Sequence, residues 1–237
     1  MDVAEYYRTL LTRREEIANE NIADVDAFRM QSRSHNYLKD YDAMLAVING
    51  PERTIFEQGC REYQYSLEAV ICGNYRHAFA SLRLSFELFV GSIYFSAHLL
   101  KMRLWESGNE DLHWAVITDK EKGVYSHIFL RAFNGELGPY RTQYMELAST
   151  VYRECSEYVH GNPNTLEDTN LSAMYEPDIS RRFHENSETV KLCVLFAFCV
   201  RYTLALTAHE LSKLEGMILG DFGDVPEIQA LFEVTSR

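Results

Sequence analysis

The sequence lacks most of the short motifs that identify a familiar chemistry. No Gly-x-Gly-x-x-Gly or Walker pattern occurs, so nucleotide hydrolysis has no support. The tripeptide DFG at 221–223 stands without the other elements of a protein kinase. The eight histidines form no His-Glu-x-x-His or His-x-His pattern. We therefore predict no metal site and no cofactor.

Cysteine is scarce, and its spacing does not match that of a ligand set. The chain has five cysteines, an odd number, and no Cys-x-x-Cys pair. Each of them falls within an apolar, helix-like run: Cys60, Cys72, Cys155, Cys193 and Cys199. This distribution predicts reduced core residues of an intracellular protein, and neither a disulfide framework nor a zinc site.

Uninterrupted apolar segments are also absent. The first sixteen residues have no apolar core of the signal-peptide type. The two most apolar runs, 84–100 and 190–208, each contain charged or titratable residues, whereas a membrane span needs about 20 residues with few or no charges. We expect both runs to be buried helices of a cytoplasmic protein without a membrane partner.

Positively charged residues are also fewer than negatively charged ones, with 23 lysines and arginines against 35 aspartates and glutamates. The net charge is −12, with 17 arginines and only 6 lysines. Non-specific DNA binding depends on neutralising many phosphates, so this balance argues against a protein that coats DNA. Arginine suits bidentate pairing, either with phosphates or with the many carboxylates of this chain.

The residues that are present predict helices almost throughout. Polar and apolar positions recur with helical spacing, and the run after 75 is apolar on nearly every side, as in the centre of a bundle. The expected helices are 4–19, 35–48, 51–72, 75–105, 120–134, 140–160 and 187–219, with a long polar loop at 161–186. The predicted fold is all-α, an up-and-down bundle of four main helices (51–72, 75–105, 140–160 and 187–219) with additional N-terminal and connecting helices. We divide the chain into an N-terminal extension packed on the bundle (1–50), the bundle (51–220) and a C-terminal tail (221–237).

The segment "VYRECSEYVHGNPN" at 151–164 contains the candidate site. On the helix 140–160, one stripe is apolar and predicts the core face: Tyr144, Leu147, Val151, Cys155, Tyr158 and Val159. A second stripe is polar and consists of Arg153, Ser156, Glu157 and His160. Arg153 and His160 are two turns apart, about 10 Å along the axis, so their side chains can serve one phosphate between them.

Two charged residues fall within the apolar helix that precedes this segment. Arg83 and Glu87 are four residues apart, and buried charges must be paired. They form an ion pair with each other or with the next helix, or they line the same polar pocket as Arg153 and His160; the two arrangements are compatible. Arg181 and Arg182 belong to a small basic cluster that either contacts RNA or is a solvated approach to the last helix.

The string "YRECSEYVHGN", following "GNYRHAFASLRLSFEL", resembles the HEPN superfamily (higher eukaryotes and prokaryotes nucleotide-binding). That family is a helical bundle, often dimeric, marked by an arginine, then four to six intervening residues, then a histidine near a helix end. Arg153 and His160 occupy those places, and the following Gly161 fits a common form of the motif. The resemblance covers roughly residues 52–210 in architecture, and its specific part is this single motif.

The resemblance implies a metal-independent endoribonuclease of a toxin or antiviral defence system. His160 would act as general acid or base, since its reference pKa suits both roles, and Arg153 would stabilise charge on the phosphate. Ser156 and Glu157 would orient the histidine. A two-fold homodimer would supply a second acid–base group, and a protein partner or antitoxin would fit such a system.

A second hypothesis is a non-catalytic helical module that dimerises or holds a partner. Glu154, an acid directly after the arginine, and the negative net charge favour it. In this case His160 caps a helix end, with Gly161 as the terminating residue and Pro163 reinforcing the stop, and Arg153 pairs with Glu157.

Overall fold

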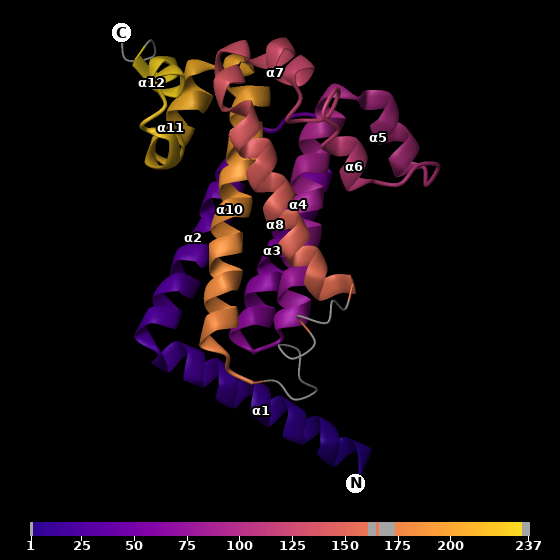
Figure 1. The fold of residues 1–237 in the computed structure, drawn as a ribbon, viewed down its shortest axis with the longest axis vertical. Coiled ribbons are helices and arrows are strands. Elements are labelled where there is room, and N and C mark those ends of the chain that lie inside the picture. Colours follow the sequence, from indigo (N-terminus) through magenta and orange to yellow (C-terminus); the bar gives the residue numbers. More distant parts are fainter. Residues whose placement is uncertain (1, 161–164, 166–173, 234–237) are drawn as a thin grey trace.

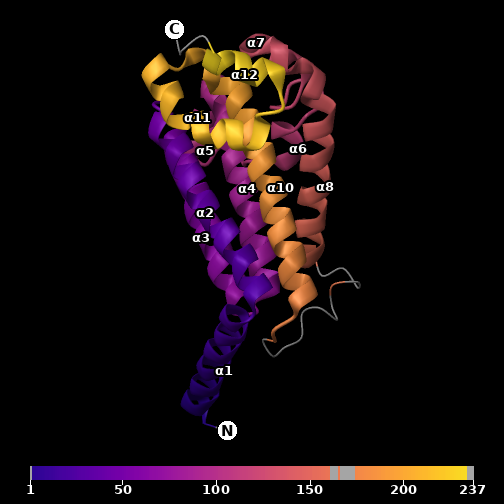
Figure 2. The same cartoon turned by 90° about the vertical axis from the view of Figure 1, so that its left-hand side faces the viewer.

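The computed structural model describes residues 2–160, 165 and 174–233, and over these residues the protein is all-α, without a strand. Figures 1 and 2 show a tall bundle with short helices gathered at one end and α1 projecting from the other. The α-helices are α1 (Val3–Ala23), α2 (Val25–Val47), α3 (Arg53–Ile71), α4 (Tyr75–Ala97), α5 (Leu99–Glu106), α6 (Trp114–Ile117), α7 (His127–Phe133), α8 (Arg141–His160), α10 (Pro177–Tyr202), α11 (Ala208–Phe222) and α12 (Pro226–Glu233). Two 3₁₀ helices, η1 (Gly135–Tyr140) and η3 (Thr203–Ala205), connect them.

The bundle consists of α2, α3, α4, α8 and α10, which run alternately up and down (Figure 1). α10 packs against α2, α4 and α8, and its middle is buried on all sides, with Val190, Val194 and Phe198 fully enclosed. The predicted all-α bundle is confirmed. The second half of the predicted N-terminal extension, as α2, lies within the bundle, because Tyr41 and Met44 are buried in its core.

A tight turn joins α3 to α4 and places the two helices side by side. Gly73 has φ +70°, a conformation that only glycine adopts without strain. The N–H of Asn74 donates to the carbonyl of Ala69 (2.8 Å) and that of Gly73 to Val70 (3.0 Å), which is the Schellman ending of a helix. A Cβ at Gly73 would lie 2.5 Å from the carbonyl oxygen of Met174. The absence of a side chain at Gly73 therefore lets the segment that leads into α10 pack closely against this turn.

The last bundle helix differs from the prediction at both ends. It begins at Pro177, ten residues before the expected start, so the segment 177–186 is helix and not loop. The proline occupies the first turn, where its missing N–H costs nothing, and Ile179 and Phe183 are buried four residues apart. The helix ends at Tyr202, and a new helix, α11, begins after Thr207, whose side chain forms a capping box with Glu210. Most of the remaining predicted loop, 161–164 and 166–173, lies outside the described residues.

The long apolar helix also differs from the prediction, because it ends at Ala97 and not near 105. His98 leaves the helical conformation (φ −132°, ψ 63°) and its ring stacks on Tyr94 at 4.0 Å, after which α5 begins. By length and composition α4 is apolar enough to cross a membrane, and 67% of that window is buried inside the bundle. The core helix of a globular bundle meets the same criterion.

The shorter helices depart from their expected bounds as well. The predicted helices 4–19 and 35–48 are longer in the structure, as α1 and α2, and Asp24 caps α2 by accepting from the N–H groups of Asp26 and Ala27 at 3.0 Å. The predicted helix 120–134 shortens to α7. α12 forms within the predicted C-terminal tail, whose first two residues belong to α11.

The charges within the apolar run 190–208 are paired inside the bundle. The Lys191 ammonium is 5% exposed and bonds to Asp221 and, at 3.3 Å, to Asp40. The Arg201 guanidinium donates to the hydroxyl of Ser96 at 2.7 Å. Because each charge has a partner, this run can be buried despite its composition.

Candidate functional site

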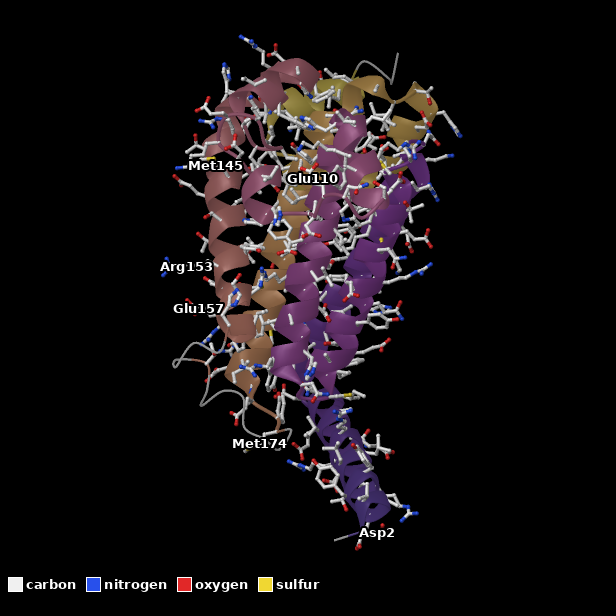
Figure 3. All side chains as sticks on the ribbon, turned by 90° about the vertical axis from the view of Figure 1, so that its right-hand side faces the viewer. Asp2, Glu110, Met145, Arg153, Glu157 and Met174 are labelled. Carbon is white, nitrogen blue, oxygen red and sulfur yellow. The ribbon has the colours of Figure 1, made fainter. Side chains whose placement is uncertain are left out.

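α8 presents the predicted motif on the edge of the bundle. Its inner face is buried: Tyr144, Ala148, Val151, Cys155 and Tyr158. Val159, predicted to belong to the core, is 40% exposed, because the buried stripe passes from Cys155 to Tyr158 and the helix ends one residue after Val159. The opposite face projects outward, as Arg153 and Glu157 do in Figure 3.

The two residues of the predicted catalytic pair are both exposed on the last two turns of α8. Arg153 lines a cleft of about 600 Å³ between α8 and α10. His160 does not line it and lies about one turn beyond Glu157, at the last residue of the helix. Gly161 and Pro163, expected to end the helix, lie outside the described residues. The pair therefore shares one face of α8, with the arginine at the cleft and the histidine below it.

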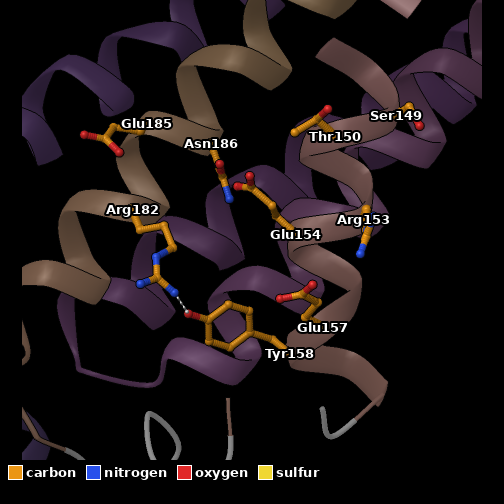
Figure 4. Close-up of a pocket in the computed structure, with 9 residues that line it drawn as sticks. All are labelled: Ser149, Thr150, Arg153, Glu154, Glu157, Tyr158, Arg182, Glu185 and Asn186. Atoms are coloured by element: carbon orange, nitrogen blue, oxygen red, sulfur yellow. Dashed lines mark hydrogen bonds between the residues drawn. The ribbon is translucent and has the colours of Figure 1, made fainter. Parts of the chain in front are cut away.

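The cleft is lined by nine residues, drawn in Figure 4. They come from two helices: Ser149, Thr150, Arg153, Glu154, Glu157 and Tyr158 from α8, and Arg182, Glu185 and Asn186 from α10. Two arginines face three carboxylates, so the cleft combines both signs of charge. Arginine guanidinium groups can bind a phosphate, and carboxylates accept hydrogen bonds from amino groups.

An aromatic stack supports the floor of the cleft. The ring of Tyr158 lies parallel to that of Phe79 from α4, with 3.9 Å between centroids. Its hydroxyl accepts a hydrogen bond from Arg182 at 3.2 Å (Figure 4). The carbonyl of Tyr158 accepts another from Arg76 at 3.1 Å. Because α4, α8 and α10 meet at this one side chain, the two walls of the cleft are held in register.

Of the residues predicted to support the site or to bind RNA, some line the cleft and others form contacts outside it. Glu157 lines the cleft, and among the described residues it makes no ion pair with Arg153, so that i,i+4 pairing is not present. Ser156 donates its hydroxyl back to the carbonyl of Tyr152 at 2.6 Å, within its own helix. Of the predicted basic cluster, Arg182 lines the cleft, whereas Arg181 is exposed beside it and pairs with Asp178 at 3.2 Å.

Arg83 and Glu87 form a separate cluster on the α4 side of α8. Their side chains, about 20% exposed, pair at 3.1 Å, and neither lines the cleft. The hydroxyl of Tyr152 joins them, accepting from Arg83 at 2.5 Å and donating to Glu87 at 2.5 Å. Trp114 stacks on the Tyr152 ring at 4.1 Å, and burial first, then the Glu87 carboxylate, raises the pKa of Tyr152 to about 12. The pair thus fastens α4 to α8 behind the cleft.

Asn186 and Tyr152 are two residues of this region that the sequence analysis did not single out. Asn186 is 6% exposed, lines the cleft, and its Nδ2 has no hydrogen-bond partner. It belonged to the segment expected to be loop, and the spacing Ile179–Phe183–Val190 was the signal that could have placed it on a helix. Tyr152 lies in the motif itself, but its partners come from another helix.

Metal-ligating groups do not gather in the described part of the chain. Among these residues, no three His, Cys, Asp or Glu side chains are arranged so that they could hold a metal ion. The five cysteines are free, and Cys155, Cys193 and Cys199 are buried.

Comparisons with known proteins found no match for this chain. No protein-family model matches it, and neither a curated protein nor a solved structure does.

Proposed function

We propose that the protein is a metal-independent endoribonuclease that cleaves RNA with Arg153 and His160. The observation that supports the proposal is the exposure of both side chains on one face of α8, with Arg153 at a polar cleft that also contains Arg182. The resemblance of "YRECSEYVHGN" to the HEPN superfamily supplies the reaction. A toxin or antiviral defence role in the cytoplasm, with a partner protein or antitoxin, belongs to the same proposal.

The chemistry follows from the two side chains. A phosphate held by the Arg153 guanidinium, and by Arg182 across the cleft, would lie within reach of the last turn of α8. His160 would remove the proton of the ribose 2′-hydroxyl, or protonate the leaving 5′-oxygen. The attack raises the negative charge on the phosphate oxygens, and Arg153 stabilises that charge. One chain supplies one histidine, so we propose that a second copy supplies the other proton-transfer group.

The test is cleavage of a labelled single-stranded RNA in the presence of EDTA. We expect the parent to cleave and His160→Ala to lose at least about a hundredfold in rate, the usual contribution of a general acid or base. Arg153→Ala should lose a comparable factor through weaker transition-state stabilisation. His127→Ala and Arg131→Ala are matched controls, since both residues are exposed on α7 at the other end of the bundle. Full activity in His160→Ala would remove this histidine from the reaction.

A second candidate function is a non-catalytic module that binds a partner. The three carboxylates of the cleft favour it, as does the uncovered apolar stripe on α1, in which Val3, Tyr7 and Leu11 are 57–69% exposed. Under this function the parent cleaves no RNA. Because both side chains are exposed, Arg153→Ala and His160→Ala should change the free energy of unfolding by no more than about 0.5 kcal/mol under either function, so RNA cleavage by the parent separates the two.

A further inference from the structure

The wall of the cleft carries an ordered pattern of hydrogen-bonding groups. Asn186 on α10 and Glu154 on α8 line the same cleft from opposite sides. Figure 4 shows the amide nitrogen of Asn186 and the carboxylate of Glu154 reaching into the space between the two helices. The two side chains extend towards each other (Figure 4), so an N–H donor and two oxygen acceptors can face one edge of the same ligand.

The Asn186 amide has a hydrogen bond still to make. The side chain is 6% exposed, and Nδ2 has neither a protein partner nor contact with solvent. Buried polar groups are nearly always hydrogen-bonded, because an unmade bond costs the free energy of desolvation. Rotation of the Asn186 amide towards the cleft would bring Nδ2 to an acceptor supplied by a ligand and would recover that free energy.

We infer that the cleft binds a guanine base of the RNA, an inference that rests on the proposed function. The Glu154 carboxylate accepts hydrogen bonds from the guanine N1–H and N2–H groups. Asn186 Nδ2 donates to the neighbouring O6. Proteins commonly read single-stranded RNA in this way, through the Watson–Crick edges of splayed bases.

Guanine fits the pattern better than the other three bases. Its Watson–Crick edge places one acceptor, O6, beside two donors, N1–H and N2–H. The edges of adenine and cytosine alternate an amino group with a ring acceptor, and uracil has one N–H between two carbonyls. None of these three can satisfy both oxygens of one carboxylate and a neighbouring amide donor together.

The rest of the cleft suits a nucleotide. Its volume of about 600 Å³ lies within the range of roughly 300–1,000 Å³ that is usual for small-molecule sites. Arg182, one turn before Asn186 on α10, lines the same cleft and would share with Arg153 the phosphate next to the base. Arg153 lies on the α8 wall one residue before Glu154, so it is placed to bind the phosphate of the nucleotide whose base Glu154 contacts. An arginine side chain of a protein would also suit Glu154, but it has no acceptor for Asn186.

Calorimetric titration of the intact protein with GMP, AMP, CMP, UMP and IMP tests the inference. We expect GMP to bind about tenfold or more tightly than the other natural nucleotides, as one good bidentate contact discriminates between bases. IMP lacks the 2-amino group, so it should bind more weakly than GMP. Glu154→Gln and Asn186→Leu should each weaken GMP binding about tenfold or more.

The controls separate recognition from folding. Glu146→Gln makes the same change of charge on the exposed side of α8, outside the cleft, and should bind GMP as the parent does. Glu154 is only partly buried, so its variant tests the inference even if Asn186→Leu unfolds. Free L-arginine serves as the competing probe.

Each possible outcome bears on one of two claims, the guanine site or the ribonuclease activity. Equal binding of the nucleotides, no binding of any, IMP binding as tightly as GMP, or arginine binding more tightly than GMP would overturn the guanine site. Cleavage of RNA that depends on His160 without preference for guanine, together with no GMP binding, would keep the ribonuclease and remove the base site. Selective GMP binding by a protein that cleaves no RNA would keep the base site and remove the ribonuclease.

Discussion

Two polar side chains of α10 are buried on different faces of the helix, and they differ in their partners. His184 faces α2, where its Nδ1 lies 2.9 Å from the hydroxyl of Ser34. The hydroxyl of Tyr63 donates to the Ser34 carbonyl at 2.8 Å and lies 2.6 Å from that of Ser187. This satisfied network ties α2 and α3 to α10. Asn186, two residues along, lines the cleft, and its Nδ2 has no hydrogen-bond partner, which is why we include it in the candidate site.

The buried histidine makes stability depend on pH. Burial lowers the pKa of His184 to about 4, against about 6.5 in the unfolded chain. Between these values the unfolded state binds a proton that the folded state does not. The contribution is therefore fully present above pH 6.5, and up to about 3 kcal/mol of it is lost as the pH falls towards 4. Urea unfolding at pH 4.5–7.5 should show a shallower pH dependence for His184→Gln than for the parent, and parallel curves would contradict this assignment.

At the scale of elements, one hydroxyl between two charges contributes to the contact of α4 with α8. Removing it in Tyr152→Phe leaves Arg83 and Glu87 paired at 3.1 Å and should cost about 1 kcal/mol, the net value of a hydrogen bond. Glu87→Gln takes the charge partner from Arg83 and should cost about 2 kcal/mol, because the pair is only partly exposed. Urea unfolding of both variants measures these losses. A smaller loss for Glu87→Gln than for Tyr152→Phe would show that the hydroxyl, not the ion pair, holds the contact.

Helical periodicity predicted the existence of the bundle helices, but not where two of them end. The start of α10 was missed because its first turns are polar on the outer face, and the buried positions Ile179 and Phe183 were too few to outweigh two nearby prolines. The end of α4 at Ala97 has no breaker in the sequence. His98 leaves the helical conformation there, and its ring stacks on Tyr94, a contact that propensity does not encode.

The candidate site was predictable only along a single helix. The spacing of Arg153 and Glu157 placed both on one face of α8, and both line the cleft. The opposite wall, with Arg182 and Asn186, depends on the rotation of α10 against α8. The hydroxyl that joins Arg83 to Glu87 depends likewise on how α4 meets α8. A sequence read one helix at a time has no information on these relative positions.

At the scale of the whole molecule, the uncovered stripe of α1 bears on the proposed dimer. Val3, Tyr7 and Leu11 are 57–69% exposed on one face of a helix that projects from the bundle. α1 crosses beneath the end of the bundle at which α8 ends (Figure 1). Apolar patches of this kind commonly mark contact surfaces. A two-fold contact along α1 would cover the stripe and bring a second α8 end, with its His160, towards the first.

This arrangement predicts that association and RNA cleavage change together. Tyr7→Glu combined with Leu11→Glu should convert a two-copy particle into a single chain, measured by sedimentation equilibrium, because burying two carboxylates in an apolar contact is costly. Leu204→Glu is the matched control, since this leucine is equally exposed (61%) at the opposite end of the bundle. Thermal stability of the isolated chain should change little, as the substituted side chains are solvated. Cleavage per chain should fall in the α1 variant and recover on raising the protein concentration. If the parent sediments as a single chain and still cleaves RNA, a single His160 is sufficient for the reaction.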